Sequence, residues 1–112
     1  MASSGASSFQ WTANGGGFSA NGGKLTVTVN NNAASELVWG STVGTNLVGT
    51  LQFGNATANA EAELQNKIDL SGVDRTINVT AGSAGAFGTI SGIIRNTSGT
   101  AGLAKTGTGR LF

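Results

Sequence analysis

The sequence predicts an all-β fold: a single-domain parallel β-solenoid of about four coils of ~26 residues. Three observations favour this fold. Glycine is abundant, with 19 residues, Pro is absent, and only 10% of the 112 residues are charged. Short apolar runs recur at a fixed spacing, and a Gly or Asn position recurs with them. We expect a flexible leader at residues 1–8 and the solenoid domain at residues 9–112.

The apolar runs are expected to be strands, at residues 25–29, 37–39, 51–53, 64–68, 77–79 and 90–94. One apolar residue from each run, followed by Leu103, gives two interleaved columns with a period of 26. The predicted core columns are Leu25, Leu51, Ile77 and Leu103, and Val38, Leu64 and Ile90. Antiparallel hairpins would not align residues 26 apart, whereas stacked parallel coils require it. The Gly/Asn/Ser-rich stretches 14–23 and 96–102 are expected to be loops between strands.

The recurring Gly or Asn position predicts a corner of each coil. It comprises Asn14, Gly40, Asn66 and Gly92. Gly and Asn accept a left-handed backbone at the least cost. Charged and apolar residues alternate over residues 61–70, and this alternation places Asn66 on the apolar face. We therefore expect Asn66 to point inward, with a left-handed backbone or with its side chain bonded to turn amides.

The C-terminal residues resemble a known repeat. Residues 102–111, Gly-Leu-Ala-Lys-Thr-Gly-Thr-Gly-Arg-Leu, resemble the signature G-L-T-K-x-G-x-G-T-L of the autotransporter-associated β-strand repeat, also called the passenger-associated transport repeat. Ala104 and Arg110 replace two Thr residues of that signature. The resemblance covers roughly residues 11–111, including segments such as 64–70 and 75–79. It implies a right-handed parallel β-helix that is exported and carries no catalysis of its own.

The composition argues against most chemistry. With no His and no Cys, the commonest general base, the commonest metal ligand and the thiol nucleophile are missing. Glu61 and Glu63 share a strand face and are the one candidate carboxylate pair, but a solvated face that offsets Lys67 explains them better. We predict that the protein is not an enzyme and has no catalytic, cofactor-binding or metal-binding residues.

The basic residues argue against nucleic-acid binding. Arg75, Arg95 and Arg110 do not cluster with one another or with the lysines, and no aromatic residues interleave with them. No apolar run approaches the ~20 residues needed to cross a bilayer. Residues 1–8 also lack the basic and apolar regions of a signal peptide. If the protein is exported, we expect its targeting segment to be absent from this chain.

The expected function is structural, in a bacterial cell-surface or extracellular protein. The end contacts would be Phe9, Trp11, Leu111 and Phe112, with the chain itself as partner in a head-to-tail filament. The alternative is an adhesin-type module, excised from a larger autotransporter-like passenger, that binds a glycan or a host protein. An enzyme built on a β-helix is the weakest hypothesis.

Overall fold

The structure is a computed structural model that describes residues 11–40 and 46–112. These residues form eleven short β-strands and one 3-10 turn, Val29–Asn31. The strands are β1 (Gly16–Phe18), β2 (Leu25–Val27), β3 (Glu36–Gly40), β4 (Leu47–Val48), β5 (Leu51–Phe53), β6 (Ala62–Leu64), β7 (Lys67–Asp69), β8 (Arg75–Val79), β9 (Gly88–Ile90), β10 (Ile94–Arg95) and β11 (Leu103–Thr106). The all-β class is therefore confirmed. No helix in the described ranges is long and apolar enough to cross a membrane.

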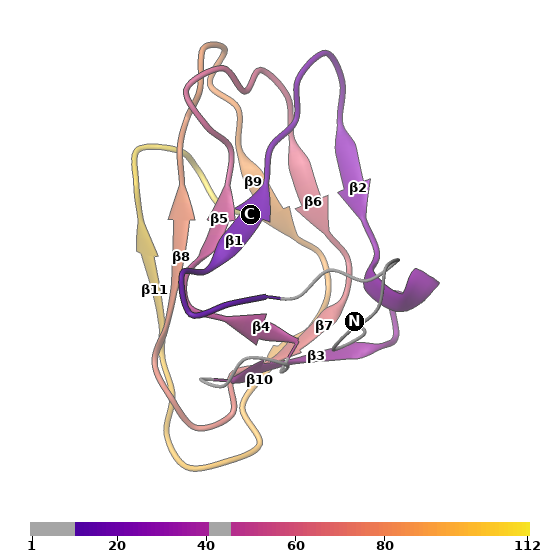
Figure 1. Ribbon diagram of the computed structural model, residues 1–112, viewed down its shortest axis with the longest axis vertical. Helices are drawn as coiled ribbons and strands as arrows, with labels where there is room; N and C mark the ends of the chain where they lie inside the picture. Colours follow the sequence, from indigo (N-terminus) through magenta and orange to yellow (C-terminus); the bar gives the residue numbers. More distant parts are fainter. Residues whose placement is uncertain (1–10, 41–45) are drawn as a thin grey trace.

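The strands are arranged in three parallel sheets. Their orders are β1-β5-β8-β11, β10-β7-β3-β4 and β2-β6-β9. Figure 1 shows the sheets on three sides of a shared interior, with β8 and β11 on the left, β2 and β6 on the right, and β3 and β10 below. Because the chain visits the sheets in turn, neighbouring strands in a sheet mostly come from distant parts of the sequence.

The predicted β-solenoid, and the right-handed parallel β-helix that the resemblance implies, are wrong. Residues 11–40 and 46–112 form three separate small sheets with strands of two to five residues, and no closed, continuous solenoid is found among them. The expected uniform period also fails. Leu51 pairs with Ile77 as predicted, but Gly16 pairs with Leu51 and Leu25 with Ala62, at 35 and 37 residues. Loops of unequal length separate the strands, and lengthening a loop costs little free energy.

The predicted core columns are correct only in their middle. Leu51 and Ile77 are paired and buried, and Leu64 pairs with Ile90. The other three predicted members, Leu25, Val38 and Leu103, are 37–38% exposed and pair with Ala62, Asp69 and Arg75. Val38 fails because successive residues of a strand point to opposite faces, so a register error of one residue exchanges inside for outside.

Val38 shows how that error arises. Its neighbours Leu37 and Trp39 take the inward positions of β3 and are 0% and 1% exposed. The largest fully buried side chains are Trp39, Phe53, Leu37, Leu47, Leu51, Leu64, Ile68, Ile77, Val48 and Val79, together with the amide of Asn66. The core is therefore a layered stack of aliphatic and aromatic residues, with one polar group inside it.

The predicted corner column is correct at two of its four positions. Asn66 lies between β6 and β7, and Gly92 stacks upon it, since a Cβ at Gly92 would lie 2.0 Å from the Asn66 carbonyl oxygen. Gly40 instead ends β3 and pairs with Val48, and Asn14 lies in the turn that Thr12 and Gly15 close. These two positions were displaced because the early loops are longer than a uniform repeat allows.

Asn66 holds a turn of the preceding layer. Its side chain is completely buried, and its Oδ1 accepts a hydrogen bond from the Val29 N–H at 2.7 Å. Its Nδ2 donates to the carbonyl oxygens of Val29, Asn32 and Ser35, at 3.0–3.1 Å. Left-handed backbone occurs instead within the turn, at Asn30 and Asn31. The side-chain form of the Asn66 prediction is therefore confirmed, and this amide fixes the wide turn between β2 and β3.

We expect Asn66→Ala to lower the free energy of unfolding by about 3 kcal/mol, because it leaves several buried backbone groups without a partner. Chemical denaturation monitored by circular dichroism measures this change. Asn59→Ala is the control: its amide bonds Gly22 and Asn21 at the surface, so its loss should cost less than about 1 kcal/mol. Equal costs for the two variants would show that the buried amide is not what holds the turn.

Candidate functional site

The three sheets end together on one side of the molecule. β10 and β11 are the last strands of their sheets. Beyond β9, residues 110–112 add a strand-like segment: Gly88 N–H donates to Arg110 O, Phe112 N–H to Gly88 O, and Ile90 N–H to Phe112 O. We call β10, β11 and residues 110–112 the C-terminal edge. Its outward-facing backbone groups have no further strand among the described residues.

The core reaches the surface at the C-terminal edge. Leu37, Ile68 and Ile94 occupy one row across β3, β7 and β10. The first two are 0% exposed, whereas Ile94 is 37% exposed. Ile93 and Phe112 are also exposed there, at 63% and 62%. Ile94 continues a buried row, and no further strand among residues 11–40 and 46–112 covers it.

The predicted end contacts fall at opposite ends of the molecule. Leu111 packs against the core beside Gly88, and the Phe112 ring meets the Phe87 ring edge-on at 5.1 Å. Trp11 is buried at the other end, where its ring meets Phe18 at 5.9 Å. Phe9, like the expected leader, lies outside the described residues. Leu111 and Phe112 are thus the predicted contacts that belong to the C-terminal edge.

One lysine lies on the inward row of this edge. Lys105 pairs with Ile77, which places it in the row of Leu51 and Ile77 where an apolar residue would be expected. Its ammonium group donates to the carbonyl oxygens of Thr106 at 3.3 Å and Gly107 at 2.9 Å. A lysine on an edge strand disfavours indiscriminate pairing with other strands. The edge therefore combines exposed apolar residues with a charge that limits which strands it accepts.

The candidate carboxylate pair is bound by a lysine. Lys24 Nζ lies 3.2 Å from Glu61 Oε2 and 2.5 Å from Glu63 Oε2. Glu63 also accepts a hydrogen bond from Ser91 Oγ at 2.6 Å. The bond from Lys24, followed by that from Ser91, lowers the pKa of Glu63. The bonds to Glu63 and then to Glu61 raise the pKa of Lys24. Glu63 therefore stays ionised near neutral pH, which is unfavourable for a general acid.

A second ion pair spans three strands. Arg95 on β10 reaches across β7 to Glu36 on β3, with Nη2 at 2.7 Å from Oε1 and Nε at 2.5 Å from Oε2. This bidentate bond lowers the pKa of Glu36. On the intervening strand, Asp69 is 5% exposed, and the bond from the Thr97 hydroxyl at 2.5 Å is the main cause that lowers its pKa. These carboxylates join layers of the sheet.

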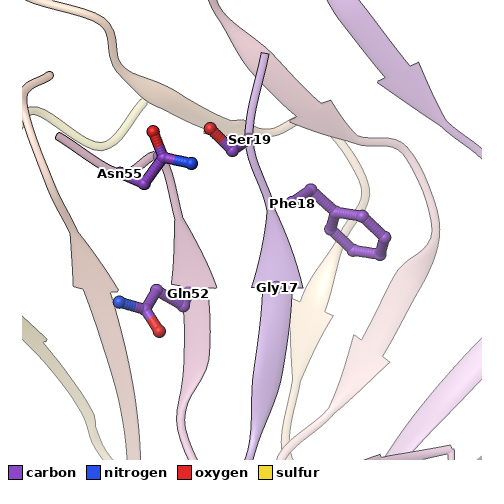
Figure 2. A pocket seen from close by; sticks show the side chains of 6 residues that line it. Gly17, Phe18, Ser19, Gln52 and Asn55 are labelled. Atoms are coloured by element: carbon purple, nitrogen blue, oxygen red, sulfur yellow. The ribbon is translucent and has the colours of Figure 1, made fainter. Parts of the chain in front are cut away.

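A shallow polar hollow of about 230 Å³ lies over β1 and β5. Figure 2 shows the Gln52 and Asn55 side chains on one side of β1 and the Phe18 ring on the other. Amide groups in such a hollow can exchange hydrogen bonds with sugar hydroxyls. However, the hollow also follows from strand packing, because a Cβ at Gly17 would lie 1.8 Å from the Gln52 carbonyl oxygen. The glycine is required by the close approach of two strands, whether or not a ligand binds.

Comparison of the chain with protein families, curated proteins and solved structures finds no match in any of the three. The resemblance to the autotransporter-associated repeat therefore stays a prediction.

The sequence analysis did not identify two residues with a clear position in the structure, Ile94 and Arg75. Ile94 was placed in the predicted strand at residues 90–94 but in neither core column. Arg75 is inward and caps the ends of two strands, β3 and β7, donating to the carbonyl oxygens of Leu70 at 3.0 Å, Gly40 at 3.5 Å and Trp39. A single arginine within a strand carries no pattern that could have indicated this. Ile94 could have been assigned to the row of Leu37 and Ile68 only if the pairing of the three strands had been known.

The lowered pKa values predict acid sensitivity. Glu36, Glu63 and Asp69 have folded-state pKa values below their ordinary values of 4.5, 4.5 and 3.8, so the unfolded chain binds protons more readily. Their contribution to stability is present above those ordinary values and is lost as the pH falls through the folded pKa. We expect the urea midpoint to fall steadily below about pH 4.5. Asp69→Asn should be less stable at pH 7 and less sensitive to acid, and an unchanged pH profile in this variant would contradict the argument.

Proposed function

We propose that this chain is a non-enzymatic structural module that associates end to end through its C-terminal edge, as a component of a bacterial surface or extracellular protein. The observation that carries the proposal is the row of Leu37, Ile68 and Ile94, which is buried in two layers and exposed in the third. Burying apolar surface is worth about 25 cal/mol per Å². A further layer of strands on this edge would gain that energy.

Backbone chemistry favours the same partner. An edge strand presents N–H and C=O groups that an additional strand can pair with. β10 and β11 offer such groups beside exposed apolar side chains, and all four residues of β11 are exposed. A polar cap or a helix that covered the edge would hide both features, and the described residues include neither. The edge is therefore suited to strand addition.

The opposite end offers a matching surface. β1, β2 and β4 are the outermost strands there, and Leu25 on β2 is 37% exposed although its row continues through buried Ala62. Strands at both ends run in parallel with the strands between them. A contact that keeps this direction joins the end of one copy to the start of the next, so it does not close into a ring and produces an open filament.

The alternative, an adhesin-type module, would use the polar hollow at Gln52 and Asn55. It is the weaker proposal because the hollow is explained by the required glycine at Gly17, whereas strand packing does not explain the exposure of Ile94. A glycan array with the purified protein tests the alternative directly. Specific, saturable binding that is lost in Gln52→Ala would favour it.

We expect the wild-type protein to form oligomers that grow with concentration, seen by sedimentation velocity and as short rods by negative-stain microscopy. Ile94→Asp introduces a charge into the exposed row and should leave the protein monomeric while preserving its β circular dichroism. Val73→Asp is the matched control. Val73 is an exposed apolar residue, 53% accessible, in the loop between β7 and β8 and outside the row of Leu37, Ile68 and Ile94.

Two results would contradict the proposal. One is a wild-type protein that remains monomeric at the highest accessible concentration. The other is equal loss of association in the Ile94 and Val73 variants, because general surface hydrophobicity would then be the cause rather than the edge.

A further inference from the structure

We propose that the strand layer added to the C-terminal edge comes from a second copy of this chain in one defined register: residues 110–112 pair with β2 of the next copy, so that Leu111 faces Leu25 and Phe112 faces Thr26. This inference rests on the proposed function and specifies its partner and contacts. Two independent features of the described residues support it.

The first feature is equal depth. Two of the sheets contain four strands, and the third contains β2, β6 and β9 with residues 110–112 as a fourth level. Over residues 11–40 and 46–112, the molecule is therefore four strand levels deep on all three sides. A second copy moved by four strand spacings, about 19 Å, would extend all three sheets at once. The shortest molecular dimension, 25 Å, is consistent with four levels and their side chains.

The second feature is the match of side-chain rows in the third sheet. Leu25, Ala62, Gly88 and Leu111 occupy one inward row from the first level to the last. Leu25 is 37% exposed at one end, and Leu111 is partly buried against the core at the other. Stacking in the proposed register places these two leucines against each other. The row then continues from one copy into the next as an apolar column.

Disulfide trapping tests the register. Within one chain, Thr26 and Phe112 are three strand levels apart, about 14 Å, which exceeds the ~7 Å Cα separation that a disulfide allows. In the stack they are neighbours. The double variant Thr26→Cys/Phe112→Cys should therefore give a ladder of linked multimers on mild oxidation, seen on a non-reducing gel and removed by reductant. Thr26→Cys/Ala104→Cys is the control, because Ala104 is exposed on β11 in a different sheet.

The outcomes separate this inference from the proposed function. A ladder in Thr26→Cys/Phe112→Cys that is absent in the control supports the register. Wild-type association without that ladder, or with an equal ladder in the control, overturns the register and leaves end-to-end association standing. Failure of the wild type to associate at all overturns both.

Discussion

The structure depends on the pairing of short parallel strands across layers. A strand of two to five residues buries too little surface to be stable alone, and each interior strand is held by neighbours on both sides. Leu51 and Ile77 illustrate the result, since each is covered by the layers before and after it. Among the described residues, the strands of the C-terminal edge have a neighbouring strand on one side only. The buried core and the exposed C-terminal edge are thus consequences of one constraint.

Polar side chains connect these layers at turns and strand ends, where strands do not pair through their backbones. The Asn66 amide holds the turn after β2, and Arg75 caps the ends of strands from two layers. Glu36 and Arg95 bridge three strands of one sheet. The long loops lie outside the ladders of strand hydrogen bonds, so these contacts determine where the chain leaves one sheet and enters the next.

Several charged side chains also form contacts between neighbouring strands. Glu63 and Asp69 accept hydrogen bonds that keep them ionised, and Lys24 is divided between two carboxylates. A site for acid–base chemistry needs a group whose protonation state can change near neutral pH. The lowered pKa values of these carboxylates move them away from that range. This is why the proposed function is built on the edge and not on the charged faces.

The sequence by itself determined the all-β class, the parallel pairing and the inward position of Asn66, because these follow from local alternation and from spacing within the middle of the chain. The pairs Leu51–Ile77 and Leu64–Ile90 were predictable for the same reason. Only the tertiary structure decided the division into three separate sheets, the register that points Val38 outward, and the end strands on which Leu25 and Leu103 are exposed. Loop length changes which residues meet without changing the strand pattern, and it costs little free energy. Sequence periodicity therefore cannot fix the register across loops of unequal length.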